Sequence, residues 1–132
     1  MSILKNKSEI NLLAAEMLHG NSLYPSVIHC SYYSTFQLMK FIWLEKMGKD
    51  ENELRSLSNK SSDKGSHEVL INEIVMWLAT KGANSRDFNN KIGILKKLRR
   101  KADYENTQID IQISSDSIKL CKETIGILRM LK

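Results

Sequence analysis

The chain has one proline, Pro25, among its 132 residues, so long stretches can form helix without interruption. Apolar residues recur along most of the chain at spacings of three and four. This is the periodicity of an α-helix that buries one face. The sequence therefore predicts an all-α protein, a four- to five-helix up-and-down bundle.

The apolar periodicity predicts five helical segments, at about 8–19, 23–47, 66–80, 85–104 and 115–131. Gly20, Gly48 and Gly82 follow the first three, where a glycine can adopt the left-handed conformation that ends a helix. We expect Ser22 and Ser66 to be the N-caps of the second and third segments.

Two of these segments have apolar faces whose burial can be predicted. We expect the first to bury the face that carries Ile10, Leu13, Ala14, Met17 and Leu18. The second is apolar on more than one face between Phe36 and Leu44. A helix of this kind is central to a bundle or is covered by another subunit, so we expect a homodimer.

Two stretches have no clear helical pattern. Residues 48–65 are rich in serine and mixed charges, and only Leu54 and Leu57 could anchor them, so we expect a mobile loop with at most one short turn. The segment Ile109–Ile113 alternates with period two. We interpret it as an extended connector with its isoleucines docked on the bundle; the alternative is a strand that pairs with the same strand of a second copy.

Size and composition indicate one helical domain over residues 1–132, at 15.2 kDa and 42% apolar residues. No apolar run approaches the roughly 18 residues of a membrane span. The N-terminus has no apolar signal-peptide core, so we expect a cytoplasmic protein without membrane association. Cys30 and Cys121 form no CxxC motif, and the three histidines are scattered. We therefore expect neither a disulfide nor a metal site, and no sequence motif indicates a cofactor.

Positive charge is concentrated in one short stretch. The net charge is +5, and Lys91–Lys101 alone holds six basic residues and no acidic one. Such a cluster suggests phosphate as a partner, although basic helix ends are also common for structural reasons. The candidate phosphate-binding residues are Lys96, Lys97, Arg99, Arg100 and Lys101.

Arg99 is the residue best placed to form a site. It borders the apolar stripe of its segment, so we expect it to be partly buried and paired with Asp103, four residues later. A plain ion pair at a solvated helix end is the alternative. Tyr32 and Tyr33 point about 100° apart on a helix, so one should enter the core while the other faces a groove or a second chain. Ser31 and Ser34 beside them are small enough for close helix packing.

These residues also resemble a known family. Tyr24, the block Ser31–Phe36, Ser66-His67 at a helix start and Arg99-x-x-Ala102-Asp103-Tyr104 are similar to motifs of the HEPN superfamily, in the small bacterial branch with an RxxADY signature. The resemblance covers residues from about 8 to 131. It implies a bundle of two antiparallel helical hairpins, usually a homodimer. It also implies a role beside a minimal nucleotidyltransferase in toxin–antitoxin or other defence systems.

Many HEPN proteins are metal-independent ribonucleases with an R-x(4–6)-H motif. Arg99 matches the arginine, but positions 104–106 hold Tyr, Glu and Asn, so the histidine is missing. Tyrosine is a poor general base at neutral pH. The sequence therefore favours a nucleotide- or RNA-binding module, with Asp103, Tyr32 and Tyr33 supporting the site.

Two alternatives remain open. The first is a ribonuclease in which Arg99 stabilises phosphate charge while Tyr104 or His67 moves a proton. The second is a helical scaffold that only holds another protein.

Overall fold

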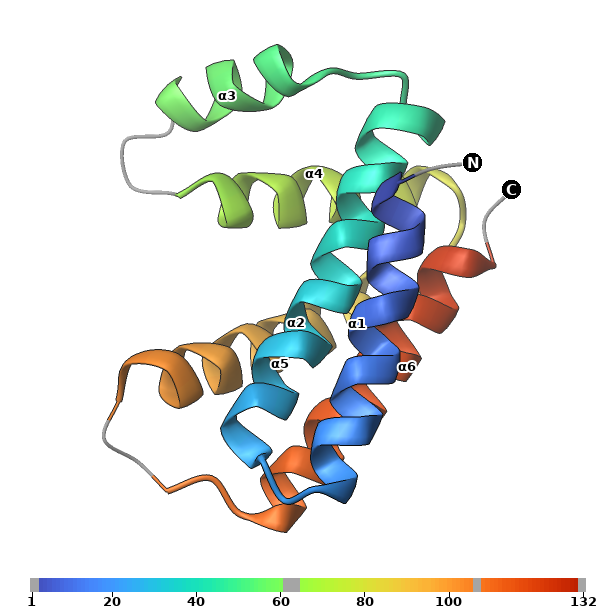
Figure 1. Ribbon diagram of the computed structural model, residues 1–132. Coiled ribbons are helices and arrows are strands. Elements are labelled where there is room, and N and C mark those ends of the chain that lie inside the picture. Colours follow the sequence, from blue (N-terminus) through green and yellow to red (C-terminus); the bar gives the residue numbers. More distant parts are fainter. Residues whose placement is uncertain (1–2, 61–64, 106–107, 131–132) are drawn as a thin grey trace.

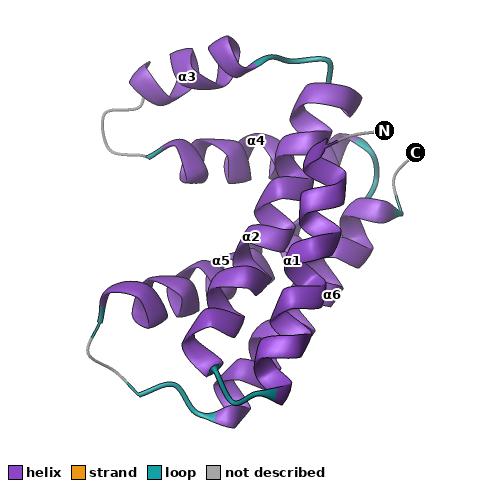
Figure 2. Cartoon of the chain, in the orientation of Figure 1, coloured by secondary structure: helices purple, strands orange, loops and turns teal. Residues whose placement is uncertain are grey.

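The computed structural model describes residues 3–60, 65–105 and 108–130. These residues form a bundle of six α-helices and contain no strand (Figure 2). The helices are α1 (Ile3–Gly20), α2 (Tyr24–Phe41), α3 (Glu51–Lys60), α4 (Ser66–Thr80), α5 (Ser85–Tyr104) and α6 (Ile111–Arg129). The predicted all-α class is confirmed, and α3 is one helix more than predicted.

Helix α2 lies at the centre and packs against α1, α4, α5 and α6. In Figure 1, α1, α2 and α6 run side by side, and the α3–α4 pair and α5 extend from them toward the same side. This central position accounts for the wide apolar surface of α2, because other helices of the same chain cover it. The apolar girth of α2 therefore gives no reason to expect a second subunit.

A π-helical turn, η1 (Ile42–Lys46), continues α2 without a break. It lies where the chain buries its largest core side chain, Trp43, which is 1% exposed. The indole Nε1 of Trp43 donates a hydrogen bond to the carbonyl oxygen of Asp50 at 2.9 Å. The turn thus combines burial of a large ring with a partner for its polar atom.

Small polar side chains hold α2 close to α1 and α6. Ser8 Oγ of α1 donates to the Ser34 carbonyl oxygen of α2 at 2.6 Å, and Ser34 Oγ donates to the Ser8 carbonyl oxygen at 2.7 Å. On the α6 side, Thr35 Oγ1 lies 2.9 Å from Thr124 Oγ1, and Ser117 Oγ donates to Ser31 Oγ at 3.4 Å. The predicted close packing at Ser31 and Ser34 is confirmed.

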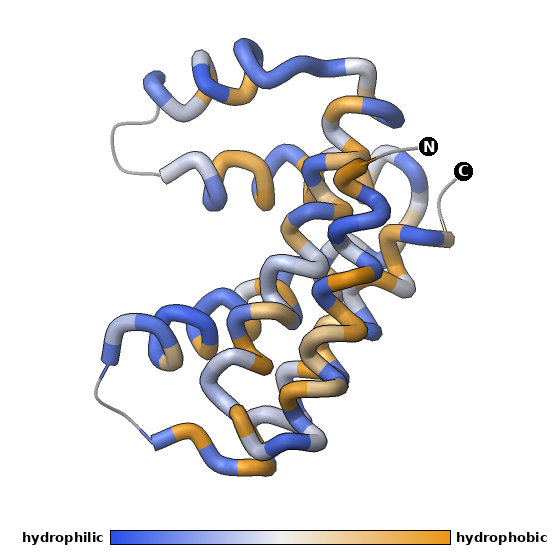
Figure 3. The backbone as a smooth tube through the Cα atoms, in the orientation of Figure 1, coloured by the Kyte–Doolittle hydropathy of each residue, from blue (hydrophilic) through white to orange (hydrophobic). Residues whose placement is uncertain are grey.

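The face of α1 that we expected to be buried is largely exposed. Ile10, Leu13 and Met17 are 55%, 61% and 69% exposed, whereas Ser8 and Ala15 are buried. Only small residues allow α1 to approach α2 closely enough for the reciprocal serine hydrogen bonds, so the apolar residues point outward. Figure 3 shows apolar positions along α1 as orange segments.

Helix ends agree only in part with the predicted caps. Gly48 and Gly82 have φ of +66° and +74°, as expected for glycines that end helices. Gly20 instead stays in α1, and Ser22 takes the left-handed conformation with φ +62°. Neither predicted serine is an N-cap, since α2 begins after Leu23 and α4 after Gly65, both without a side-chain cap.

The prediction of a loop is wrong for residues 51–60, which form α3. Asp50 Oδ1 accepts a hydrogen bond from the Glu53 backbone N–H at 2.8 Å, so Asp50 caps the helix. Leu54 is buried and Leu57 packs against the core. These two leucines lie on the same side of α3 and anchor it to the bundle. The helix is longer than the single short turn that the sequence predicts. Residues 61–64 lie outside the described residues.

The connector prediction is wrong as well, because α6 begins at Ile111 rather than near residue 115. Asp110 Oδ1 accepts from the Ile113 backbone N–H at 2.9 Å and caps the helix. The period-two alternation of Ile109–Ile113 arises because this segment contains the start of α6. Ile109 is buried, whereas Ile111 is 59% exposed. Leu131, the last residue of the predicted stripe, is not among the described residues.

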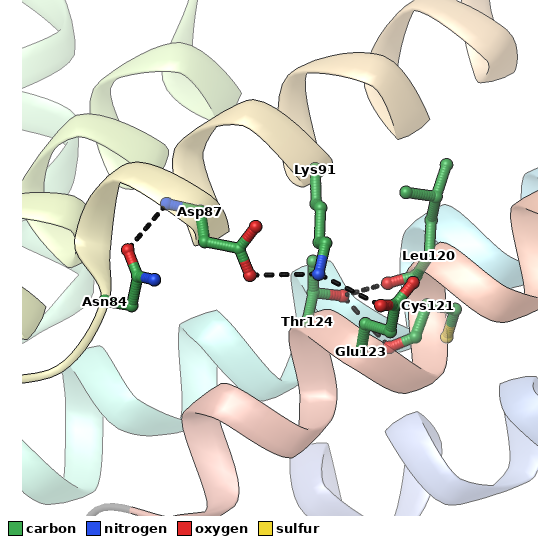
Figure 4. Close-up of polar contacts among 7 residues, drawn as sticks. All are labelled: Asn84, Asp87, Lys91, Leu120, Cys121, Glu123 and Thr124. Carbon is green, nitrogen blue, oxygen red and sulfur yellow. Dashed lines mark hydrogen bonds and ion pairs between the residues drawn. The ribbon is translucent and has the colours of Figure 1, made fainter.

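The ranges predicted for α4 and α5 agree with the structure. Figure 4 shows how α5 begins: Asn84 Oδ1 accepts from the Asp87 backbone N–H at 3.1 Å, and Lys91 Nζ lies 2.9 Å from Asp87 Oδ2 and 3.0 Å from Glu123 Oε2 on α6. Hydrogen bonds to these carboxylates raise the pKa of Lys91. Lys91 therefore joins two helices and is not part of a free basic surface.

Cys30 and Cys121 are both free thiols, and burial raises the pKa of each. Among the described helices, none is long and apolar enough to cross a membrane.

Candidate functional site

A hollow of about 730 Å³ lies between the start of α4 and the last turns of α5. Its lining residues are Gly65, Ser66, His67, Glu68, Lys96, Arg99, Arg100 and Tyr104. The three candidate catalytic residues, Arg99, His67 and Tyr104, therefore meet at one place. His67 belongs to α4, whereas Arg99 and Tyr104 belong to α5, so the fold brings together residues that are far apart in the sequence.

The helical spacing of α5 divides the predicted basic residues into two sets. Lys96, Arg99 and Arg100 are three and four residues apart, share one face and line the hollow. Lys97 and Lys101 are exposed and do not line it. The phosphate-binding prediction is thus consistent with the geometry for three of its five residues.

Arg99 is the most enclosed cation of the hollow, with a side chain 12% exposed. Its Nη1 lies 3.5 Å from Asp103 Oδ2 and 3.5 Å from the Tyr33 hydroxyl oxygen. The guanidinium carbon lies 5.0 Å from the centre of the Tyr32 ring and 5.9 Å from that of Tyr104. The predicted partial burial and the pairing with Asp103 are confirmed.

The Nε atom of Arg99 is buried and has no hydrogen-bond partner among the described residues. Such an unpaired buried donor costs free energy. Departures of this kind from full pairing concentrate at functional sites.

His67 lies on a stack of aromatic rings. Its ring centre is 4.0 Å from that of Phe36, with the planes inclined by 23°, and its Nδ1 lies 2.9 Å from the Tyr32 hydroxyl oxygen. Burial lowers the pKa of His67 to about 4, and the charges of Arg99 and Lys96 act in the same direction. The imidazole is therefore neutral at pH 7.

Tyr32 and Tyr33 differ in burial, as their angular separation on the helix predicts. Tyr32 is fully buried, and this burial raises the pKa of its hydroxyl. Tyr33 is half-buried and contacts both Arg99 and the ring of His29, whose centre is 4.7 Å away.

Sequence reasoning missed His29, which joins the site through Asp103. Its Nδ1 lies 3.1 Å from Asp103 Oδ2, and its side chain is 50% exposed. Asp103 therefore lies between His29 on α2 and Arg99 on α5. Because the two residues are far apart in sequence, no local spacing could have revealed the pair.

Local charges favour an anion in the hollow. The first residues of α4 line it, and their backbone N–H groups have no partner within the helix. The helix dipole places partial positive charge at this end. Among the described lining residues Glu68 is the one carboxylate, and Lys96 Nζ binds it at 2.6 Å. The two lining arginines lie beside the helix start, and Arg99 is paired with Asp103 while Arg100 is exposed.

In the described part of the chain, no group of three or more His, Cys, Asp or Glu side chains is placed to hold a metal ion. The site has instead the features of an anion receptor: arginines, a helix start and aromatic rings.

Comparison with known proteins adds no assignment. No family model, curated protein or solved structure matches this chain.

Proposed function

We propose that this protein is a HEPN-like module that binds the phosphate groups of RNA or of a nucleotide in the hollow between α4 and α5. The observation that carries the proposal is the position of Arg99, a largely buried guanidinium that lines this hollow beside Arg100 and the start of α4. A guanidinium fixed by packing presents its donors to phosphate with little loss of entropy.

The protonation state of His67 favours binding over cleavage. A general base is most effective when its pKa lies near the working pH, and the pKa of His67 is about 4. The neutral ring can donate or accept a hydrogen bond and can stack against a base. It is poorly suited to accept a proton in a rate-limiting step.

One observation supports ribonuclease activity as a second candidate function. His67, Arg99 and Tyr104 line the same hollow, so a proton-transfer group and a phosphate-stabilising group lie together. In that reaction the ribose 2′-hydroxyl would lose its proton and attack phosphorus, and the 5′-oxygen would leave with a proton.

Binding is tested with a fluorescein-labelled single-stranded RNA in anisotropy titrations at several salt concentrations. We expect affinity to fall with salt at a log–log slope of about −0.7 for each neutralised phosphate. Arg100→Gln should weaken binding and flatten the slope, whereas Lys101→Gln, one residue further but outside the hollow, should change neither. Equal effects of the two variants would contradict the proposal.

Cleavage is tested by incubating the same RNA with the protein in the presence of a chelator. We expect intact RNA. If the wild-type protein cuts RNA and both His67→Gln and Tyr104→Phe abolish cutting, the ribonuclease replaces the binding module. If the RNA neither binds at low salt nor is cut, the scaffold alternative is favoured.

The same resemblance supports a nucleotidyltransferase partner, a role in a toxin–antitoxin or defence system and a homodimer. The exposed apolar face of α1 also supports the homodimer, because large exposed apolar surfaces mark contacts with other proteins. Co-purification with the product of a neighbouring nucleotidyltransferase gene tests the partner. Growth arrest on expression of this chain alone tests the toxin role.

A further inference from the structure

Two further hollows adjoin the proposed phosphate site, one at each end. The first, of about 400 Å³, lies between α2, α3 and α4 and shares Ser66 and His67 with the phosphate site. The second, of about 440 Å³, lies between the start of α2 and the end of α5 and shares Tyr104 with it. Because each neighbour shares lining residues with the central hollow and none with the other neighbour, the three hollows follow one another in a row, with the phosphate site in the middle.

Each junction has one aromatic side chain, His67 at the first and Tyr104 at the second, and both line the hollows. His67 is stacked on Phe36, and both line the hollow beside α3. Tyr104 is 77% exposed, which is unusual for so large an apolar ring. Every base has a flat face that can stack on such rings, whatever its sequence.

Cations continue beyond the central hollow. Arg55 and Lys40 line the hollow beside α3. Lys40 is paired with Glu51 at 2.9 Å, whereas Arg55 makes only a long hydrogen bond of 3.4 Å, to Asn52, in the described part of the chain. A phosphate chain running from Arg99 into the hollow beside α3 would meet Arg55 there.

We infer that the row of three hollows binds single-stranded RNA, with a nucleotide in each hollow and bases stacked at His67 and Tyr104. This inference rests on the proposed function, since the middle nucleotide uses the phosphate site. Paired bases in a duplex are stacked on one another and cannot reach these rings, so the path is specific for single strands. A mononucleotide fills only part of the row.

The test uses fluorescein-labelled uridine mono-, tri- and hexanucleotides, and a duplex as long as the hexanucleotide, in anisotropy titrations at low salt. We expect the trinucleotide to bind at least about tenfold more tightly than the mononucleotide, because one stacked base contributes about that factor. The duplex should bind less tightly than the hexanucleotide.

Variants test the path at each end. Tyr104→Ala should weaken trinucleotide binding about tenfold, and Tyr104→Phe, which keeps the ring, should restore it. Ile94→Ala, at an exposed apolar position of the same helix that lines a different hollow, is the matched control. Arg55→Gln should reduce the log–log salt slope for the hexanucleotide by about 0.7, and Lys97→Gln should leave it unchanged.

The outcomes separate this inference from the proposed function. Equal affinity for the mono- and hexanucleotide, or for the duplex and the single strand, would overturn the path and leave the phosphate site in place. An unchanged affinity in Tyr104→Ala would also overturn it. If none of the probes binds at low salt, the proposed function fails too.

Discussion

Arg99 keeps a charge at the edge of the core, where its Nε has no hydrogen-bond partner within the described part of the chain and its Nη1 lies 3.5 Å from Asp103 Oδ2. Removing one member of a largely buried ion pair leaves the other charge without its partner and is destabilising, and truncation adds a cavity. We expect Arg99→Ala to lose about 1–3 kcal/mol of unfolding free energy in urea, and Arg99→Met to lose less, because methionine keeps most of the packing of the arginine stem.

Both Arg99 variants should lose RNA binding. Equal destabilisation of the Met and Ala variants would contradict this interpretation, because packing of the Arg99 side chain would then contribute nothing beyond its charge. Comparing the two substitutions therefore separates the contribution of Arg99 to folding from its contribution to binding.

His67 should make stability depend on pH. Its pKa falls from 6.5 to about 4 on folding, so the unfolded chain binds more protons between these values. Stability is then complete above pH 6.5 and decreases as the pH falls toward 4. We expect a loss of about 2 kcal/mol, allowing for partial exposure of the ring.

Urea denaturation of the wild-type protein and of His67→Gln at pH 7 and pH 5 isolates this contribution. The glutamine does not titrate, so its stability should change less over the same range. Parallel pH profiles for the two proteins would show that the ring is accessible to protons in the folded state.

At the level of single residues, sequence spacing could predict what lies within one helix. The pair Arg99–Asp103 and the divided roles of Tyr32 and Tyr33 follow from the helical repeat. The positions of His67 and His29 depend instead on how α4 and α2 cross α5. Such contacts are set by tertiary packing and have no signature in a single sequence.

Among the elements, α1 and α2 are joined by the reciprocal bonds of Ser8 and Ser34. Ser34→Ala removes one of these hydrogen bonds, so we expect it to lower the free energy of unfolding by about 1 kcal/mol. Ser34→Val forces a branched side chain between two close backbones and should cost about 1–3 kcal/mol more. Chemical denaturation measures both.

Ser26→Val, at an exposed position of the same helix, is the control and should change stability by no more than about 0.5 kcal/mol. If Ser34→Val is as stable as this control, the helices can separate without cost and the serines do not set their distance.

The helices that were predicted well are those in which apolar periodicity and termini agree. For α4 and α5 the stripe is long and Gly82 ends the first of them, so both ranges were right. The starts of α3 and α6 do not follow from apolar periodicity, because the N-caps Asp50 and Asp110 lie in stretches that lack a clear helical stripe. In α1 the apolar stripe was real but pointed outward, because close packing on α2 requires small residues.

For the molecule as a whole, the homodimer stays a prediction. The apolar surface of α2 does not support it, because other helices of the chain cover that surface, whereas the exposed apolar face of α1 does support it. We expect light scattering to give about twice the chain mass of 15.2 kDa at micromolar concentration. Placing charges in the exposed face by Leu13→Glu and Met17→Glu should reduce the mass to that of one chain, because buried unpaired charges are costly at an interface.

Met76→Glu, at an exposed position on α4, is the control and should leave the dimer intact. A mass of one chain for the wild-type protein over this range would remove the homodimer. A dimer that survives both α1 substitutions would place the contact on another surface.

The serine-lined contact of α1 also affects local stability. Ser8 and Ala15 are the fully buried residues of α1, and Leu12 packs against the core only in part, so detaching α1 exposes less of its own apolar surface than detaching α2 would. Helices held mainly by hydrogen bonds and small contacts open locally before the whole chain unfolds. In native-state hydrogen exchange, the backbone amides of α1 should therefore exchange at a lower opening free energy than those of α2. Different helices of this chain would then open at different free energies, and not all together.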